Sequence, residues 1–270
     1  MSDPCPTILA DLFGLDGQVA AVIGGAGRIG KVLCRALAEA GANVSILDVD
    51  ASAAERIAHE IASTTSRQVL PLATDTTRED QLEAAVARIT TTLGAPDILV
   101  NSAQFRGADF YGSDVESYPK QAWDHVLEVN LSGVHLACQA FARCMSRHRG
   151  GRIVNLASTY GVVSPDPRIY GTSGVNSPVS YAASKAGVIQ LTRFLAVHLR
   201  ERNIRVNCLV PGGVFDAQAG DFVERYAERT PLGRMATAED YRGAVLFMVS
   251  AASAYMTGAV VTVDGGWTVW

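Results

Sequence analysis

The stretch VAAVIGGAGRIG, residues 19–30, joins a short apolar run to a glycine-rich turn and the start of a helical pattern. The apolar run has the continuous β-type composition of a strand that is buried on both faces. Gly24, Gly27 and Gly30 permit a tight turn and a close approach of the backbone to a ligand. Because the first N–H groups of the following helix attract phosphate, the stretch predicts a dinucleotide site.

Asp48 ends the next apolar run, 18 residues after Gly30. A carboxylate at this place can accept hydrogen bonds from both hydroxyls of an adenine ribose, and it would repel a 2′-phosphate. Arg28 argues for NADP instead, because a cation near the ribose could accommodate its 2′-phosphate. We expect Asp48 to dominate, since it stands where the phosphate would have to lie, and we therefore predict NAD as the cofactor, with NADP second.

Outward from this stretch, short apolar runs alternate with segments of helical period. The expected strands are Val19–Ile23, Val44–Leu47, Val69–Ala73, Ile98–Val100, Arg152–Leu156, Ile204–Leu209 and Ala259–Val263. The expected helices are Ile29–Ala40, Ala51–Thr64, Arg78–Leu93, Gln121–Arg149, Tyr181–Arg200 and Ala238–Ser250. This alternation predicts an α/β protein with a doubly wound parallel sheet (a Rossmann fold) of about seven strands, covered by helices on both faces. Ligands of such sheets bind beyond the carboxyl ends of the strands.

Bulk properties narrow the class of protein. The 270 residues contain no repeat or break in composition, so we expect one domain over 1–270, with substrate-side loops at 159–180 and 212–232. A net charge of −4 gives no reason to expect nucleic acid or a membrane surface as a partner. The N-terminus lacks the basic flank of a secretory signal, and no apolar run reaches membrane-spanning length, which indicates a cytoplasmic protein. Five cysteines without ligand spacing indicate free thiols and no metal.

Tyr181 and Lys185, in the stretch YAASK, lie four residues apart at the start of a helical pattern. They therefore share one face of the helix. An ammonium near a phenol lowers the phenol's pKa from its ordinary value of about 10 and makes it a usable acid and base. A solvated helix face with an extended lysine is the plainer interpretation.

With these residues the sequence resembles the short-chain dehydrogenase/reductase family over essentially its whole length. The matching motifs are GGAGRIG, Asp48, Asp75, NSAQ at 101–104, VNLSG with Asn130, IVNLAS with Ser158, YAASK, VNCLVPGG at 206–213 and VDGGW. The resemblance implies that Tyr181 exchanges the proton of a substrate hydroxyl and that Ser158 orients the oxygen. It also implies that Lys185 binds the nicotinamide ribose, and that Asn130 supports a water path for the proton.

The cofactor contacts implied by the motifs are Gly24, Gly27, Arg28, Ile29, Gly30, Asp48, Asp75, Thr76, Asn101, Ala103, Tyr181, Lys185, Pro211, Gly212 and Val214. The family resemblance further suggests a homotetramer or a homodimer. Trp267 and Trp270 are expected at a subunit contact or near the site. His125, His135 and His198 are expected to be ordinary helix residues.

The departures from the family pattern carry information about the substrate. Arg28 replaces the middle glycine of the usual loop, and Asp216 stands where many relatives have a threonine. The distance from Ser158 to Tyr181 is 23 residues, where relatives commonly have about a dozen. The extra segment carries Arg168, Tyr170, Thr172, Ser173 and Asn176, of which we predict Arg168, Tyr170 and Asn176 as substrate contacts. Such a polar loop favours a hydroxyl-rich or anionic small molecule, similar to members that act on sugar-derived compounds.

Three functions remain open at this stage. The first is an NAD-dependent dehydrogenase of a secondary alcohol on a polyhydroxylated substrate. The second is an NADPH-dependent ketoreductase of acyl or polyketide carbonyls, against which Asp48 argues. The third is a catalytically silent NAD-binding protein, against which the presence of both Tyr181 and Lys185 argues.

Overall fold

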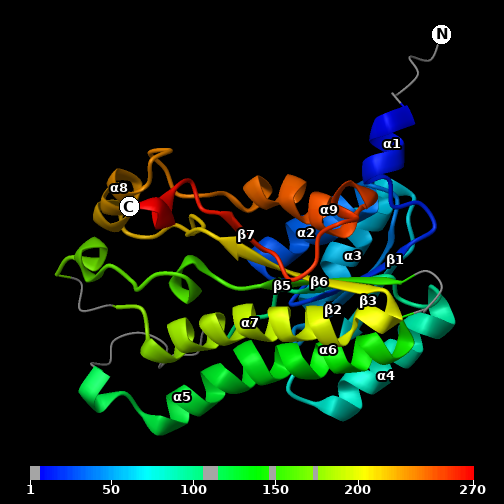
Figure 1. Cartoon of the computed structure of the whole chain (residues 1–270), viewed down its shortest axis with the longest axis horizontal. Coiled ribbons are helices and arrows are strands. Elements are labelled where there is room, and N and C mark those ends of the chain that lie inside the picture. Colours follow the sequence, from blue (N-terminus) through cyan, green and yellow to red (C-terminus); the bar gives the residue numbers. More distant parts are fainter. Residues whose placement is uncertain (1–6, 106–114, 146–149, 173–175) are drawn as a thin grey trace.

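The structure is a computed structural model that describes residues 7–105, 115–145, 150–172 and 176–270. Its centre is a sheet of seven parallel strands in the order β3-β2-β1-β4-β5-β6-β7 (Figure 1). The strands are β1 (Val19–Ile23), β2 (Asn43–Asp48), β3 (Val69–Ala73), β4 (Ile98–Asn101), β5 (Gly151–Leu156), β6 (Ile204–Pro211) and β7 (Val260–Val263). The order reverses between β1 and β4, which is where a doubly wound sheet opens a crevice for a ligand.

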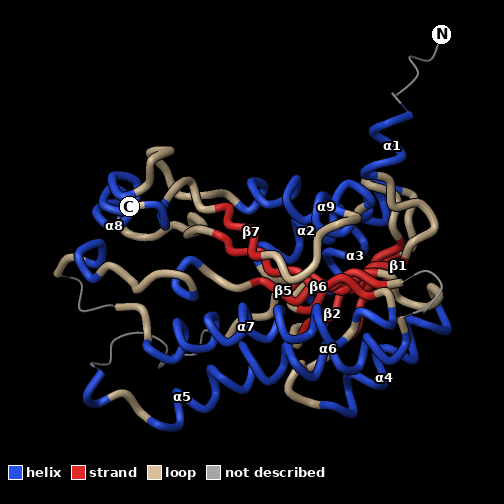
Figure 2. Tube along the Cα trace, viewed as in Figure 1, coloured by secondary structure: helices blue, strands red, loops and turns tan. Residues whose placement is uncertain are grey.

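Helices cover both faces of this sheet, as Figure 2 shows. The helices are α1 (Thr7–Phe13), α2 (Arg28–Glu39), α3 (Ala51–Thr65), α4 (Glu79–Thr92), α5 (Lys120–Leu127), α6 (Gly133–Cys144), α7 (Val179–His198), α8 (Gly220–Arg229) and α9 (Arg242–Val249). One apolar cluster joins the sheet to α2, α3 and α9, and a second joins it to α4, α6 and α7. The predicted doubly wound fold is therefore confirmed.

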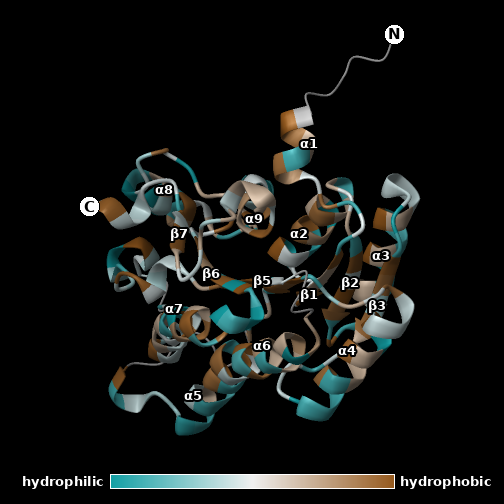
Figure 3. Cartoon of the chain, turned by 45° about the vertical axis from the view of Figure 1, so that its right-hand side comes forward, coloured by the Kyte–Doolittle hydropathy of each residue, from teal (hydrophilic) through white to brown (hydrophobic). Residues whose placement is uncertain are grey.

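The central strands are buried on both faces, which explains their continuous apolar runs. All five residues of β1 are buried, and so are all four of β4. Apolar residues concentrate in the strands and on the helix faces that meet them (Figure 3). Burying such side chains stabilises the fold by about 25 cal/mol for each Å² of apolar surface removed from water.

Three segments differ from the sequence prediction. The expected helix Gln121–Arg149 is divided into α5, a π-helical turn at Glu128–Ser132 and α6, which ends at Cys144; residues 146–149 lie outside the described residues. The stretch 212–232 was predicted as a loop, but it contains α8, whose Tyr226 side chain is buried. The short helix α1 was not predicted. Helices of this length depend on tertiary packing more than on local propensity, so the local sequence indicates them weakly.

Two further properties concern only the described residues. No helix among them is long and apolar enough to cross a membrane. No group of three or more histidine, cysteine or acidic side chains among them could hold a metal ion. Cys34, Cys138 and Cys208 are buried free thiols, Cys144 is an exposed one, and Cys5 lies outside the described residues.

Candidate active site

A cavity of about 940 Å³ opens beyond the carboxyl ends of the strands, at the point where the strand order reverses. Its wall is formed by the loops that follow β1, β2, β3, β4, β5 and β6, together with residues of α5, α7 and α8. The glycine-rich turn of residues 24–30 forms one part of the wall, and α8 with Thr159, Tyr160, Tyr170 and Ser177 forms another. The predicted position of the ligand site is therefore where the structure has its large cavity.

The glycine-rich turn can fold this tightly against the neighbouring backbone only because it lacks side chains. Gly24 has a φ of +70°, and a Cβ there would lie 2.6 Å from the Ala103 Cα. A Cβ on Gly30 would lie 2.1 Å from the Gly24 carbonyl oxygen. Gly27 caps α2 without any side-chain hydrogen bond, so the first N–H groups of the helix face the cavity end. This cradle of backbone N–H groups fits the pyrophosphate of a dinucleotide.

Asp48 lies in the cavity wall at the end of β2. Its Oδ2 accepts a hydrogen bond from the Ala26 N–H at 2.9 Å, and its Oδ1 accepts one from the Asp50 N–H at 3.1 Å. The carboxylate is therefore held between the glycine-rich turn and the start of α3. Each carboxylate oxygen has further lone-pair sites for ribose hydroxyls.

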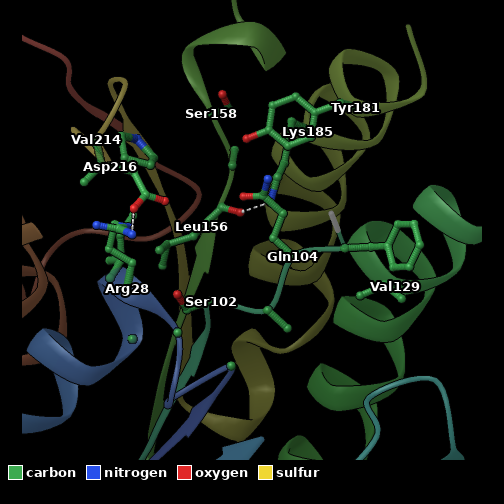
Figure 4. A pocket seen from close by; sticks show the side chains of 18 of the residues that line it. Arg28, Ser102, Gln104, Val129, Leu156, Ser158, Tyr181, Lys185, Val214 and Asp216 are labelled. Carbon is green, nitrogen blue, oxygen red and sulfur yellow. Dashed lines mark hydrogen bonds and ion pairs between the residues drawn. The ribbon is translucent and has the colours of Figure 1, made fainter. Parts of the chain in front are cut away.

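Arg28 and Asp216 form an ion pair across the mouth of the cavity (Figure 4). Arg28 is the first residue of α2, whereas Asp216 follows β6, so the pair joins two walls that are distant in sequence. The Arg28 guanidinium also donates to the Phe215 carbonyl oxygen at 3.3 Å. The two departures from the family pattern thus meet in space, and the positive charge of Arg28 is balanced by a carboxylate.

The predicted cofactor residues have different outcomes in the structure. Most of them line the cavity, namely Gly24, Gly27, Arg28, Ile29, Gly30, Asp48, Asp75, Thr76, Ala103, Tyr181, Lys185, Pro211, Gly212 and Val214. Asn101 does not line it. The Asn101 side chain is 2% exposed and points into the sheet core, where its amide donates to Asn155 Oδ1 at 2.8 Å. The strand's alternation turns this amide inward, so the Asn101 side chain does not face the cavity, and the cofactor contact at this position stays a prediction.

Ser158, Tyr181 and Lys185 are brought together on one wall of the cavity (Figure 4). Tyr181 lies in the first turn of α7, and Lys185 follows one turn later. The Lys185 Nζ lies 5.8 Å from the centre of the Tyr181 ring and donates to the Leu156 carbonyl oxygen at 3.0 Å. Lys185 is 2% exposed, so its charge acts in a desolvated setting, where electrostatic effects are stronger.

Ser158 lies two residues beyond β5 and is 7% exposed. Its Oγ accepts a hydrogen bond from the Tyr160 N–H at 3.2 Å, which orients the hydroxyl. The strand end and the helix start thus carry the serine and the tyrosine to the same wall, although 23 residues separate them.

Asn130 is completely buried in the π-helical turn between α5 and α6. Its Oδ1 accepts from the Phe105 N–H at 2.8 Å, and its Nδ2 donates to Ser184 Oγ at 3.5 Å. The side chain does not line the cavity; it joins the turn after β4 to α7. Turns of this kind are frequent at functional sites, because the extra residue shifts the backbone carbonyl groups.

Of the substrate contacts predicted in the long segment between Ser158 and Tyr181, one lines the cavity and two do not. Tyr170 lines the cavity. Arg168 does not, because its side chain is 83% exposed and paired with Asp166 at 2.7 Å. Asn176 is also exposed, and its Oδ1 accepts from the Ser177 N–H at 2.8 Å. Ser173 lies outside the described residues. The Arg168 and Asn176 side chains are thus each engaged by a close neighbour in sequence and do not line the cavity, and their contact with a substrate stays a prediction.

Several aromatic residues of the cavity were not predicted from the sequence. The structure adds Phe105, His125, Tyr160, Phe222 and Tyr226 to the wall. His125, which was expected to be an ordinary helix residue, lies 5.9 Å from Phe105 between ring centres. The i,i+4 spacing of Phe222 and Tyr226 was the available signal, but it required recognising α8 as a helix.

The C-terminal residues lie close to this end of the cavity. Trp267 is 1% exposed and stacks on Tyr226, with 4.2 Å between ring centres. Trp270 is 70% exposed, and its indole N–H donates to the Arg229 carbonyl oxygen at 3.0 Å. Trp267 thus packs against a residue of the cavity wall, which is one of the two positions expected for it, and a subunit contact stays a prediction.

Comparison with known proteins identifies relatives over nearly the whole chain. A family model described as enoyl-(acyl carrier protein) reductase matches residues 24–268. A galactitol 2-dehydrogenase (L-tagatose-forming) of Cereibacter sphaeroides is 35% identical, over 96% of this chain and 98% of its own. A D-threitol dehydrogenase of Mycolicibacterium smegmatis is 33% identical, over 95% of both chains. A 3-oxoacyl-acyl-carrier-protein reductase of Chlamydia muridarum is 32% identical, over 93% of this chain and 98% of its own.

Known structures of similar chains share the fold. A short-chain type dehydrogenase/reductase from Mycobacterium marinum has a TM-score of 0.86 and 34% identity, over 96% of this chain and 98% of its own. A gluconate 5-dehydrogenase from Burkholderia cenocepacia, in complex with NADP and tartrate, has a TM-score of 0.87 and 30% identity, over 97% and 99%. A short-chain dehydrogenase from Leptospira borgpetersenii with bound NAD⁺ has a TM-score of 0.80 and 32% identity, over 96% and 95%. The chain therefore belongs to the short-chain dehydrogenase/reductase family of NAD(P)-binding oxidoreductases.

Proposed function

We propose that the protein transfers a hydride between NAD(H) and a secondary alcohol or ketone of a polyhydroxylated small molecule, with Tyr181 as the general acid and base. The observation that carries this proposal is the position of Tyr181. It stands on the cavity wall together with the glycine-rich turn and the rings of Tyr160 and Phe222, with a buried lysine beside its own ring.

Each residue of this wall has a separate task. Bound NAD supplies the hydride acceptor for oxidation, and NADH supplies the donor for reduction. The deprotonated Tyr181 oxygen takes the proton of the substrate alcohol in oxidation, and the Tyr181 hydroxyl gives it back in reduction. The Ser158 hydroxyl donates a hydrogen bond to the reacting oxygen and so positions it. The Lys185 ammonium favours the deprotonated form of Tyr181 by its charge, and its bond to the Leu156 carbonyl oxygen fixes that charge in place.

Asn130 acts at a distance from the reacting atoms. Its two hydrogen bonds hold the turn after β4 against α7. We assign it the task of keeping the π-helical turn in place, so that backbone carbonyl groups there can hold a water chain for the Tyr181 proton. Its own amide is used in these contacts, so Asn130 is a positioning residue.

NAD is the proposed cofactor because Asp48 occupies the cavity wall where an adenine ribose is bound in doubly wound sheets. Arg28, the residue that could favour NADP, is paired with Asp216. A substrate with several hydroxyl groups is supported by the galactitol 2-dehydrogenase and the D-threitol dehydrogenase among the relatives.

A second candidate function is an NADPH-dependent reductase of acyl carbonyls. The 3-oxoacyl-acyl-carrier-protein reductase among the relatives favours it, as do the apolar surfaces of Phe222 and Met235 in the wall. The two functions differ in cofactor and in substrate. Rates with NADPH and an acetoacetyl thioester, compared with rates with NAD and galactitol, separate the two functions.

The replacement Tyr181→Phe tests the proposal, because it removes only the hydroxyl. We expect turnover of a secondary alcohol to fall by about 10²- to 10⁴-fold, the usual contribution of a general acid and base. NADH affinity, measured by the fluorescence of the bound cofactor, should stay within about 3-fold, since the ring and Lys185 remain. Tyr255→Phe is the matched control, because Tyr255 is fully exposed. Unchanged turnover in Tyr181→Phe would show that another group transfers the proton.

A further inference from the structure

The end of the cavity beyond Tyr181 has an aromatic lining, here called the aromatic end. It consists of Tyr160, Tyr170, Phe222, Tyr226 and Met235. The rings form a continuous wall, with 5.4 Å between the centres of Tyr170 and Phe222 and 6.0 Å between those of Phe222 and Tyr226. Trp267 packs behind this wall against Tyr226. The long segment and α8 thus build one surface together.

Tyr160 is the residue of this wall that lies closest in sequence to the catalytic serine, and it is held firmly. Its N–H donates to Ser158 Oγ, and its ring meets the Tyr181 ring edge-on, with 6.5 Å between centres. The Tyr160 hydroxyl lies 3.3 Å from the Tyr170 hydroxyl. Two phenol hydroxyls therefore stand side by side next to the proton-transferring tyrosine, and both come from the segment that lengthens this loop.

The hydroxyls of the wall are not equivalent. The Tyr226 hydroxyl accepts a hydrogen bond from the Gly213 N–H at 2.6 Å, which anchors α8 to the loop after β6. The Tyr160 hydroxyl has another hydroxyl as its neighbour, and each phenol oxygen can both donate and accept. Burial raises the pKa of Tyr160 above its ordinary range, so this hydroxyl keeps its proton where Tyr181 exchanges one.

The aromatic end also has a charge pattern that selects among ligands. Two arginines of α8 lie beside it: Arg225, which lies against Gly171 and pairs with Asp221 at 3.1 Å, and Arg229, which lies over the Trp267 ring and 3.7 Å from Asp166. Of the cations in the described cavity wall, Arg28 pairs with Asp216 at the dinucleotide end, and Lys185 donates to the Leu156 carbonyl oxygen. Arg168 points to solvent and pairs with Asp166. Each of these described cations already has a partner, so a phosphate or carboxylate on the substrate would be desolvated at the aromatic end beside arginines that are paired with carboxylates, which is costly.

We propose that Tyr160 and Tyr170 are specificity-determining residues, whose paired hydroxyls bind a second hydroxyl group of an uncharged polyol while the neighbouring rings pack on its C–H face. This inference rests on the proposed function and makes it narrower: the substrate is neutral, not anionic. A ring face presents apolar surface with a polar tip, which suits a molecule that alternates C–H and O–H groups.

The test measures kcat/KM for three alcohols with NAD: galactitol, its 1-phosphate, and butan-2-ol, which has one hydroxyl only. In the wild-type protein, galactitol should exceed its phosphate by at least about 10-fold. Tyr160→Phe and Tyr170→Phe should each lower kcat/KM for galactitol by about 3- to 10-fold, which is the ordinary effect of losing one neutral hydrogen bond. The same variants should leave butan-2-ol within about 2-fold. Tyr255→Phe is the control for all three alcohols.

Each result has a definite meaning. Equal losses for galactitol and butan-2-ol would overturn the assignment, because they would show that Tyr160 only positions Ser158 and Tyr181. An unchanged galactitol rate, or a preference for the phosphate, would overturn it as well. Turnover of butan-2-ol but not galactitol would leave the hydride transfer standing and remove this inference. If no alcohol is oxidised, galactitol is titrated against the NADH-bound protein by calorimetry. Galactitol binding that is weaker in Tyr160→Phe would support this inference and contradict the proposed hydride transfer. If galactitol does not bind at all, both the inference and the proposed function are wrong.

Discussion

The Asp48→Asn replacement gives the sharpest test of cofactor choice, because it removes a charge at almost constant volume. In the wild-type protein the carboxylate accepts from the N–H groups of Ala26 and Asp50. An asparagine keeps one acceptor oxygen and replaces the other by an NH₂ group. The variant therefore loses the negative charge and one contact with the surrounding backbone.

The expected magnitude follows from charge and distance. A carboxylate about 5 Å from one phosphate charge interacts with it by about 3 kcal/mol at an effective dielectric constant of about 20. Removing that repulsion should strengthen NADPH binding by about 100-fold. NADH binding should weaken by about 10-fold, because a charge-assisted bond to a ribose hydroxyl is replaced by a neutral one. The ratio of the two dissociation constants should therefore change by about 1,000-fold.

The assay is titration of NADH and NADPH against the protein, followed by cofactor fluorescence. The ratio is the useful quantity, since a shift of the glycine-rich turn affects both cofactors and cancels. Asp50→Asn is the matched control: Asp50 also lines the cavity, and it caps α3 by accepting from the Ala53 N–H, which an asparagine can also do. A ratio that changes equally in both variants, or not at all in Asp48→Asn, would refute the role given to Asp48.

Three further predictions concern the cavity and the stability of the fold. Gly30→Ala should weaken NADH binding by at least about 10-fold, because its Cβ would lie 2.1 Å from the Gly24 carbonyl oxygen and would displace the turn. Unaltered NADH affinity in a fluorescence titration would contradict the assignment of this turn as the pyrophosphate site. The Arg28–Asp216 pair is nearly half exposed, so breaking it with Asp216→Ala should lower NADH affinity by up to about 5-fold. The exchanged double variant Arg28→Asp/Asp216→Arg should restore part of this loss. Additive effects of the two replacements in a double-mutant cycle would show that the two side chains do not interact. Asp240→Asn should lower the melting temperature by about 2–4 °C near pH 7, because the carboxylate completes a capping box and its pKa is lowered chiefly by the hydrogen bond from Arg234. A folded-state pKa below the unfolded value means that this stability is present above about pH 4 and is lost at lower pH. The two melting curves should therefore converge in acid, and a constant difference down to pH 2 would contradict the assignment.

Much of the fold could be predicted because its signals are local. The run Val19–Ile23 coincides with β1, and Val69–Ala73 coincides with β3. A strand that is covered on both faces, as β1 is, needs apolar residues at every position, so its composition alone reveals it. The helix α8 was missed because its ten residues follow a glycine-rich stretch and bury only Tyr226. The position of α8 depends on contacts with distant rings, such as that between Phe222 and Tyr170, and a local sequence pattern does not indicate such contacts.

For the site, the outcome depended on whether a residue's direction is set by its own element. Tyr181 and Lys185 lie one turn apart on a helix, and helix geometry alone places them on one face. By contrast, Asn101 and Arg168 have side chains whose partners are supplied by other parts of the fold or by a loop turn. The inward amide of Asn101 pairs with Asn155 of the neighbouring strand, and Arg168 bends back to Asp166. Residue type suggested a ligand contact in both cases, but neither side chain lines the cavity.

The sequence by itself determined the alternation of the strands with most of the helices, the glycine-rich turn and the tyrosine–lysine pair, because backbone hydrogen bonding and a fixed helical period act over a few residues. Only the tertiary structure decided the Arg28–Asp216 pair and the meeting of Tyr160 and Tyr170 with Phe222. These groups belong to loops and elements that are far apart along the chain. Their distances are set by how the sheet and helices pack, and no short-range interaction fixes that packing.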